Sequence, residues 1–448
     1  MKKENLSITE TFALALQHHE RNELQVAEQL YKQILKTEPD HIESIFRLGS
    51  LKIQTGNFEQ AQQLLNKVVK IDPNHGKAHN NLGIAFQKMK KHQEAINCYE
   101  KAVEIIPDFV DAYCNLALLY TDIKKDEKAL QYCDQALNLV PEMLKAINLK
   151  SEILKRNIPL WHAPMINDSD RNNFYFLALK SVIKKNSSVF EIGTGSALLS
   201  IMAANLGAQE INTCETNSIM ANIANKVIAE NKLSKRINVI QKKSTDIEVG
   251  KDIGKSADIL VSEIFSSNLL SEEVLSSLED AKKRLISKDA KIIPEYGSIM
   301  ISLFGGDDIG KNIYTEKFEN IKLKEFNSII AKKHILQRQD LKIDLMSKAF
   351  EAFRFDFVNN NSFPPENKRI EIEAIKKGRS YGIIQWIKLE MGAGLNHENH
   401  PEKSTKASGW QKILYLFDAP IELSIGQKLF INAKHERNIG WFFLEKIQ

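Results

Sequence analysis

Several features are scarce in this sequence of 448 residues. It has only four cysteines, Cys98, Cys114, Cys133 and Cys214, and no two of them form a Cys-X-X-Cys pair. No apolar stretch approaches the roughly 18 residues of a membrane span, and the start MKKENLSITE lacks a hydrophobic signal region. These absences argue against a disulfide scaffold, a cysteine metal site and a membrane protein. They predict a chain that works in a reducing cytoplasm.

Charge is almost balanced, with 61 basic and 57 acidic residues and a net charge of +4. No run of like charges stands out, so we expect no tail that binds polyanions and no direct nucleic-acid partner. Apolar residues, in contrast, make up 43% of the chain. That share and the length suffice for two or three domains, each with its own core.

The first third of the sequence repeats every 34 residues. Four alanines keep this step: Ala27, Ala61, Ala95 and Ala129. Four prolines keep it too: Pro39, Pro73, Pro107 and Pro141. The period is that of tetratricopeptide (TPR) repeats, helical hairpins that stack into a solenoid. We predict an array over 1–155, with units at about 8–41, 42–75, 76–109 and 110–143 and a capping helix at 144–155.

Arrays of this kind bind peptides in their concave face. Asn81 and Asn115 lie one repeat apart on the helices expected to line the groove, so they are candidates to hold a peptide backbone. The alternative is that both are polar residues on a solvated helix face. Cys98, Cys114 and Cys133 fall on helix positions and are interpreted as small core residues.

A different pattern follows Pro159 and Pro164, which mark a domain boundary. SSVFEIGTG has the pattern of a strand with a glycine turn, SALLSIMAANLGA that of a helix, and EINTCE that of a second strand. This alternation predicts a Rossmann-like α/β domain over 156–296, with a parallel sheet and a ligand at the carboxyl ends of its strands.

Two glycines and a glutamate mark the expected ligand site. Gly193 and Gly195 let the backbone approach a ligand at the start of a helix. Glu215 ends the second strand, where a carboxylate can accept hydrogen bonds from two ribose hydroxyls. The pattern suits a nicotinamide dinucleotide and S-adenosylmethionine equally. It excludes a P-loop, because no Gly-Lys-Ser/Thr follows.

The remaining sequence favours S-adenosylmethionine over a nicotinamide dinucleotide. The segment SEIFSSNLLSEE places Glu263 at the end of the fourth strand and Glu272 nine residues later, so a returning loop can aim both carboxylates into one site. From Pro294 the sequence becomes rich in strand patterns, which predicts a β-barrel over 297–448. No dehydrogenase needs such an appended barrel.

At these residues the sequence resembles the protein arginine N-methyltransferases, from about Trp161 to the C-terminus. Six segments carry the resemblance in order: MINDSDRNNFYFLALKSVI, VFEIGTGSALLS, TCETNSIMANIA, KKSTDIEVG, SEIFSSNLLSEE and SGWQKILYLFDAPIELSIGQKL. The repeat array resembles the N-terminus of one branch of that family. The resemblance implies an S-adenosylmethionine-dependent enzyme (EC 2.1.1) that methylates arginine in a protein recruited by the array.

The resemblance also implies roles for individual residues. Glu263 and Glu272 would be the catalytic pair that holds the guanidinium. The cofactor would be bound by Arg171, Glu191, Gly193, Gly195, Glu215, Thr245 and Asp246. The substrate would contact Met165 and Trp410. Arginine stays protonated, with a pKa above roughly 12, so its nitrogens are poor nucleophiles. Two carboxylates can localise its charge on one side, free the other nitrogen for attack and accept the released proton.

The sequence departs from the family at one catalytic loop. Where the family commonly has Thr-His-Trp, this chain has Ser408-Gly409-Trp410, so the expected pairing of that histidine with Asp168 cannot form. The stretch HENH at 397–400 resembles a metal motif but is expected in a polar loop with no third ligand, so no metal is predicted. Two alternatives stay open: a TPR scaffold with weak or no catalysis, and a methyltransferase that acts on another nucleophile.

A further expectation concerns assembly. At about 305–345 the family inserts a helical arm that docks on a partner's cofactor domain. Phe318, Ile321, Leu323 and Phe326 are candidates for its apolar face, although they could equally line the barrel core. Only one catalytic module is present, so a two-fold homodimer is expected.

Overall fold

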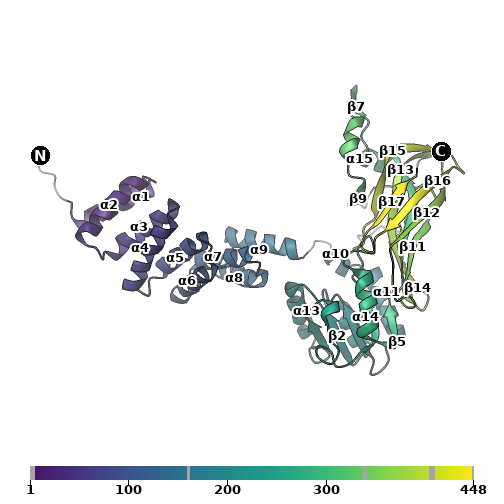
Figure 1. Cartoon of the computed structure of the whole chain (residues 1–448), viewed down its shortest axis with the longest axis horizontal. Coiled ribbons are helices and arrows are strands. Elements are labelled where there is room, and N and C mark those ends of the chain that lie inside the picture. The colour runs from purple at the N-terminus through teal and green to yellow at the C-terminus, as the bar shows by residue number, and fades with distance from the viewer. Residues whose placement is uncertain (1–5, 159–161, 337–340, 403–408, 446–448) are drawn as a thin grey trace. The chain divides into compact units, whose positions relative to one another are not determined.

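The computed structural model describes residues 6–158, 162–336, 341–402 and 409–445. The chain divides into two compact units, Met1–Asn157 and Ile158–Gln448 (Figure 1). None of the helices within the described residues is long and apolar enough to cross a membrane.

The first unit is a series of helical hairpins. In chain order the helices are α1 (Ile8–Glu20), α2 (Leu24–Thr37), α3 (Ile42–Gln54), α4 (Phe58–Ile71), α5 (Gly76–Lys88), α6 (His92–Ile105), α7 (Val110–Asp122), α8 (Asp126–Leu139) and α9 (Leu144–Asn157). Antiparallel neighbours pack in pairs, and each pair packs on the next. The predicted helical repeat is confirmed.

Close contacts between small and large residues hold each hairpin together. A Cβ added to Gly83 would lie 2.6 Å from the ring of Tyr99, and one added to Gly49 would lie 2.9 Å from Leu65. In the last hairpin, α7 and α8, Ala117 takes the place of the glycine and Cys133 takes the place of the larger residue, and both are buried. The residue pair at this contact therefore sets the interhelical spacing, because interiors leave little spare volume. Burial raises the pKa of the Cys133 thiol to about 11, in keeping with a core role.

The second unit begins with a parallel five-stranded sheet flanked by helices. Its elements are α10 (His162–Ile166), α11 (Ser169–Val182), β1 (Ser188–Ile192), α12 (Leu198–Asn205), β2 (Glu210–Cys214), α13 (Ser218–Glu230), β3 (Ile237–Ile240), η1 (Ser244–Asp246), β4 (Ala257–Ser262), α14 (Val274–Arg284) and β5 (Ile286–Ile293). The strand order is β3-β2-β1-β4-β5. The predicted Rossmann-like sheet is confirmed, and the carboxyl ends of β1, β2 and β4 meet at one edge.

Antiparallel sheets follow in the same unit, as predicted. One is seven-stranded, with β6 (Tyr296–Gly305), β9 (Lys333–Ile335), β10 (Asp344–Leu345), β11 (Phe350–Asp356), β13 (Gly378–Gly392), β14 (Leu395–Glu398) and β15 (Ile413–Leu423). The other has three strands, β12 (Glu366–Glu373), β16 (Lys428–His435) and β17 (Gly440–Leu444). The strands thus pair as two sheets, and closure into one barrel stays a prediction.

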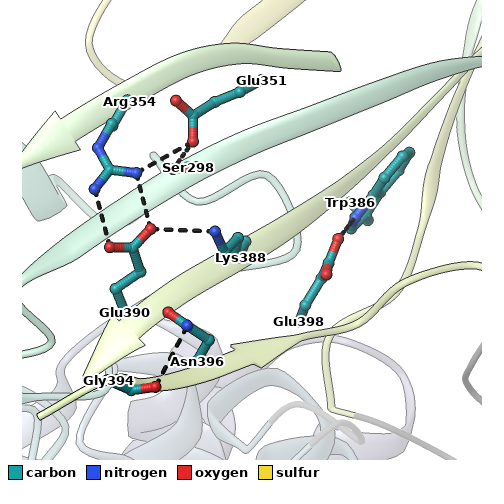
Figure 2. A network of polar contacts seen from close by, with 9 residues as sticks. All are labelled: Ser298, Glu351, Arg354, Trp386, Lys388, Glu390, Gly394, Asn396 and Glu398. Carbon is teal, nitrogen blue, oxygen red and sulfur yellow. Dashed lines mark hydrogen bonds and ion pairs between the residues drawn. The ribbon is translucent and has the colours of Figure 1, made fainter. Parts of the chain in front are cut away.

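Ion pairs reinforce the strand register on one face of the larger sheet. Arg354 on β11 reaches Glu390 on β13 with two hydrogen bonds of 2.8 and 2.9 Å, and Lys388 joins the same carboxylate at 3.2 Å (Figure 2). Beneath this face, one apolar core joins the antiparallel sheets to the parallel sheet, since Phe190 and Phe355 belong to the same buried cluster.

The stretch after β6 contains α15 (Asp307–Ile313), the short strands β7 (Lys317–Phe318) and β8 (Ile321–Lys322), and the 3₁₀ helix η2 (Lys324–Ile329). Its apolar side chains face solvent: Phe318 is 65% exposed, Ile321 59%, Phe326 58% and Leu323 36%. The alternative that these residues line the core is therefore wrong.

Candidate functional site

The glycine loop lies where β1 ends and α12 begins. Gly193 has φ +84°, and a Cβ there would lie 2.6 Å from Ile264, so no side chain fits. Gly195 has φ +50°, and a Cβ there would meet nothing within 4 Å. One glycine is therefore required by packing, and the other leaves backbone open to a ligand.

Glu215 braces this loop from the end of β2. Its carboxylate accepts hydrogen bonds from Gly195 N at 3.1 Å and from Asn217 N at 2.9 Å. A carboxylate has about four acceptor positions, so Glu215 can hold the loop and still accept hydroxyl hydrogens from a ligand.

Glu191 lies beneath the loop, in the middle of the sheet. It is 1% exposed, and the Ser200 hydroxyl donates a hydrogen bond to it. Burial raises the pKa of Glu191 to about 8, so its carboxyl is largely neutral at pH 7. Its contacts therefore support the loop from inside.

Thr245 and Asp246 lie in η1, which follows β3 along the chain. Arg284 donates a hydrogen bond to the backbone oxygen of Thr245 at 3.0 Å and fixes this turn. Thr245 is half-buried and Asp246 is exposed, so both offer polar atoms at the surface of the turn.

Arg171 and Glu263 form a buried ion pair. The side chain of Asp168 caps α11 by accepting from Arg171 N at 3.0 Å, which fixes the start of the helix. Arg171 Nη1 lies 2.9 Å from Glu263 Oε1, and the two side chains are 4% and 9% exposed. Neither of these two atoms has a hydrogen-bond partner among the described residues. Both groups therefore keep hydrogen-bonding capacity for a ligand.

The two candidate catalytic carboxyls have raised pKa values. Burial raises the pKa of Glu263 to about 7, while the charge of Arg171 opposes this rise and that of Glu272 adds to it. Burial also raises the pKa of the Glu272 carboxyl, and the charge of Glu215 adds to that rise. A carboxyl with a pKa of about 7, beside a second carboxyl whose pKa is also raised, is typical of a site where protons are exchanged.

The loop that carries these carboxyls has a strained backbone. Leu269, Glu272 and Glu273 have φ values of +70°, +64° and +58°. Residues other than glycine seldom adopt such backbone angles. The side-chain oxygen of Asn268 accepts from Leu270 N and Ser271 N, each at 2.9 Å, and holds the turn. Such strain persists only where the surroundings fix the conformation, so the direction of Glu272 is preset.

A cavity of about 230 Å³ joins this loop to the antiparallel sheets. Four predicted site residues line it: Met165, Glu263, Glu272 and Trp410. Its volume is below the roughly 300 to 1,000 Å³ of typical small-ligand pockets, and it suits a group no larger than one arginine. The structure therefore brings together the predicted catalytic pair and the two predicted substrate contacts of this unit, Met165 and Trp410. The cofactor candidates Gly193, Gly195 and Glu215 lie outside the cavity lining.

The Trp410 loop closes one side of this cavity. Trp410 Nε1 donates to the backbone oxygen of Phe265 at 2.7 Å, and Gln411 N donates to the Ser267 hydroxyl at 2.9 Å. A Cβ on Gly409 would lie 2.8 Å from Met165 Cβ and 2.9 Å from its Cα. Met165 thus packs where a histidine side chain would begin, while Ser408 lies outside the described residues.

The prediction that 397–400 is a polar loop is wrong, because part of this stretch lies on β14 and is buried. His397 ends up buried on β14, with its ring centroid 5.3 Å from Trp410 and 5.2 Å from Phe174. Asn399 donates a hydrogen bond to Trp410 O at 3.0 Å, and Glu398 accepts one from Trp386 Nε1 at 2.6 Å (Figure 2). The stretch therefore clamps the Trp410 loop. The Gly-Ala-Gly turn at 392–394 could have indicated this hairpin.

Nothing in the sequence indicated two other cavity residues, Lys333 and Ile335. They come from β9, which pairs with β15 so that Ile335 lies opposite Ile413 and Lys333 opposite Tyr415. Such a short strand in irregular sequence has no recognisable alternation, so only the tertiary pairing places it.

The predicted asparagines of the repeat unit belong to a chain of hydrogen-bonded side chains. Asn81 donates to Ser50 at 2.8 Å, and Asn115 donates to Asn80 at 2.9 Å and accepts from Lys145 at 2.8 Å. Both asparagines are half-buried and connect neighbouring repeats. Each amide keeps a further N–H, so the chain leaves donors for a ligand.

Comparisons with known proteins match both units. Residues 1–157 match the family model described as the tetratricopeptide repeat protein 21 C-terminal ARM domain, and residues 174–295 match the model of ribosomal protein L11 methyltransferase (PrmA). The chain is 30% identical over 292 residues to the arginine N(omega)-methyltransferase of Streptomyces achromogenes subsp. streptozoticus, an alignment that covers 65% of this chain and 78% of that protein.

Two further relatives cover the same unit. The chain is 28% identical over 325 residues to protein arginine N-methyltransferase 7 of Drosophila willistoni, covering 62% of this chain and 47% of that protein, so it spans less than half of that relative. The solved Trypanosoma brucei PRMT1 enzyme-prozyme heterotetrameric complex with AdoHcy aligns with a TM-score of 0.52 at 20% identity. This alignment covers 61% of this chain and 86% of that one, and it shows a shared fold.

Proposed function

Since the chain belongs to the arginine methyltransferase family, we propose that it transfers a methyl group from S-adenosylmethionine to a guanidinium nitrogen held by Glu263 and Glu272. The observation that carries this proposal is the single cavity lined by both carboxyls, with Arg171 paired to one of them. A planar guanidinium is recognised best by two carboxylates, because it offers donors on more than one edge.

The cofactor would lie along the carboxyl edge of the parallel sheet. Its residues would be Arg171, Glu191, Gly193, Gly195, Glu215, Thr245 and Asp246, with Glu191 acting from beneath. Gly195 supports this placement. A Cβ added there would meet no atom within 4 Å, so the space beside the loop backbone is open to a cofactor. When bound, S-adenosylmethionine supplies an electrophilic methyl group on a sulfonium sulfur.

The chain's own residues would align and deprotonate the substrate. An ionised Glu263 and Glu272 would attract the guanidinium charge to one side, which leaves the opposite nitrogen more nucleophilic. As the nitrogen–carbon bond forms and the sulfur–carbon bond breaks, one N–H proton must leave. A carboxyl with a pKa of about 7 is suited to accept it.

We expect activity to depend on pH through Glu263. Because burial raises its pKa to about 7, the carboxyl is mostly neutral below that pH and cannot pair with a guanidinium. A plot of kcat/KM against pH should therefore rise about tenfold per unit up to about pH 7 and then level off. For kcat the midpoint should be lower, since bound guanidinium favours the ionised form. A kcat/KM midpoint below pH 5 would contradict the assignment.

The protein-arginine substrate is part of the proposal, and relatives suggest a direct test. One relative is named for arginine and another for protein arginine. The chain would be incubated with methyl-labelled S-adenosylmethionine and either a lysate protein fraction or free L-arginine, and mass spectrometry would identify the methylated atom. Label on a nitrogen of arginine supports the proposal, whereas label on another nucleophile contradicts it.

A second candidate function is a scaffold with low turnover. The observation that favours it is Gly409, where Met165 fills the place of a histidine side chain. Absence of label in every arm, together with retained binding of S-adenosylhomocysteine, would support this alternative.

We further propose that the chain forms a homodimer through an arm at about 305–345. The support is the exposure of Phe318, Ile321 and Phe326 in this stretch, because such clusters of apolar residues mark interaction sites. Light scattering at micromolar concentration should give twice the chain mass of 51.0 kDa. The double variant Phe318→Asp, Phe326→Asp should give a monomer, since buried charges oppose docking. A fully active wild-type monomer would refute this proposal.

The repeat unit would recruit the protein substrate. Its residues 1–155 contain 20 basic and 21 acidic residues, so bulk charge would not attract an arginine-rich target and specific contacts would have to. Replacing Asn81 and Asn115 by alanine should raise KM for a whole protein several-fold, at roughly 0.5 to 1.5 kcal/mol per hydrogen bond. A short arginine peptide serves as the control and should be methylated as before. Unchanged protein KM after deletion of 1–143 in a folded remainder would count against recruitment.

A further inference from the structure

One wall of the cavity that holds the glutamates contains a lysine. Lys333 and Ile335 are two residues apart on β9, so their side chains share a face of the sheet. Their partners Tyr415 and Ile413 share the same face of β15, and Ile335, Ile413 and Lys333 all line the cavity. The half-buried Lys333 is therefore on the cavity side of the sheet.

The Lys333 amino group has no counter-ion in the part of the chain that the structure describes. It donates to Gly440 O at 3.3 Å, an oxygen that the Tyr415 hydroxyl also approaches at 2.9 Å. It lies 5.3 Å from the ring centre of Tyr415 and 5.1 Å from that of Trp441. Among the described residues no carboxylate forms an ion pair with it, and burial lowers its pKa. A partly desolvated cation with one long, shared hydrogen bond can bind an anion at little further cost.

A lysine is at odds with a cavity that accepts only a guanidinium, because the two cations repel each other. The conflict is removed if the substrate carries a negative group near its other end. We propose that Lys333 is a carboxylate subsite, so that the preferred substrate has a carboxylate within about one arginine side chain of its guanidinium. This inference rests on the proposed function and specifies its substrate class.

That carboxylate could come from two sources. It could be the α-carboxylate of free arginine or of a C-terminal arginine, or it could be the side chain of an acidic residue next to the target arginine in a protein. The cavity volume of about 230 Å³ admits either a free arginine or an arginine side chain. The recognising chemistry is the same, and matched substrates separate the sources.

The test measures the binding and methylation of guanidines that differ only in the carboxylate. L-arginine is compared with agmatine, which lacks it. A blocked Arg-Asp peptide is compared with the corresponding Arg-Asn peptide. Binding to the chain saturated with S-adenosylhomocysteine is measured by calorimetry, and kcat/KM is measured in parallel. In at least one pair, the compound with the carboxylate should be preferred about tenfold or more, as for a charge-assisted hydrogen bond.

Variants of Lys333 connect this preference to the residue. Lys333→Met keeps the packing on Tyr415 and Trp441 but should reduce the preference to within about twofold, while Lys333→Arg should retain it, because the positive charge is kept. The matched control is Lys332→Met, since Lys332 is exposed and pairs with Asp418 at 3.0 Å. Equal binding of both members of each pair to the wild type overturns the subsite alone. Binding and methylation of none of the four compounds overturns the proposed function as well.

Discussion

Replacing Glu272 by glutamine is expected to lower kcat by about 100-fold or more, in line with the loss of an acid-base group. Glutamine keeps the shape of the side chain but cannot attract the guanidinium charge or accept a proton. The strained turn at Glu272 is held by Asn268 and by packing, so the variant should fold. Binding of S-adenosylhomocysteine should be unchanged, since Glu272 lines the cavity proposed for the guanidinium, and the cofactor candidates Gly195 and Glu215 lie outside that lining.

The neighbouring Glu273 provides the control. It is exposed and pairs with Lys243, so Glu273→Gln should stay active. Full activity of Glu272→Gln together with loss in Glu273→Gln would mean that the wrong carboxylate has been assigned. Glu263→Gln is a less clean test because it leaves Arg171 buried without its partner. Removing one member of a buried pair costs about 3 to 5 kcal/mol of stability.

Loss of cofactor binding in Glu215→Ala is the second large effect that we expect. S-adenosylhomocysteine at 100 times its Kd should stabilise the wild-type chain by about 2.7 kcal/mol, seen as a rise in Tm. The variant should show no rise. Alanine removes the proposed ribose acceptor and also the brace on Gly195 N and Asn217 N, so the loop loses its shape as well.

Two controls separate binding from folding in this experiment. The Tm of ligand-free Glu215→Ala shows whether the unit still folds. Glu230→Ala, at the exposed end of α13, should keep the full ligand-induced rise. Absence of any rise for the wild-type chain at millimolar ligand would rule out cofactor binding and, with it, the methyltransferase proposals.

Regular patterns made much of the fold predictable. The 34-residue step fixed the helical repeat, because small residues such as Gly83 must recur wherever two helices meet closely. The alternation of strand and helix fixed the parallel sheet and placed Glu215 and Glu263 at its carboxyl edge. The meeting of Glu263 and Glu272 in one cavity followed from the length of the loop between them.

Other parts of the site depend on contacts between distant segments, which local patterns do not encode. His397 looked like a polar loop residue because its neighbours are polar, yet pairing with β13 buries it against Trp410. Lys333 reaches the cavity only because a three-residue strand pairs with β15. The ion pair of Arg171 with Glu263 joins two residues to which the resemblance assigns different ligands, the cofactor and the substrate.

The contact between Gly409 and Met165 limits how the catalytic loop could change. A single substitution of Gly409 by histidine would place its Cβ 2.9 Å from a backbone atom, Met165 Cα. Shortening the Met165 side chain cannot relieve that overlap, so α10 itself must shift before a histidine is tolerated. The two segments can therefore change only together, and an engineer who wishes to restore the histidine must redesign 162–166 first.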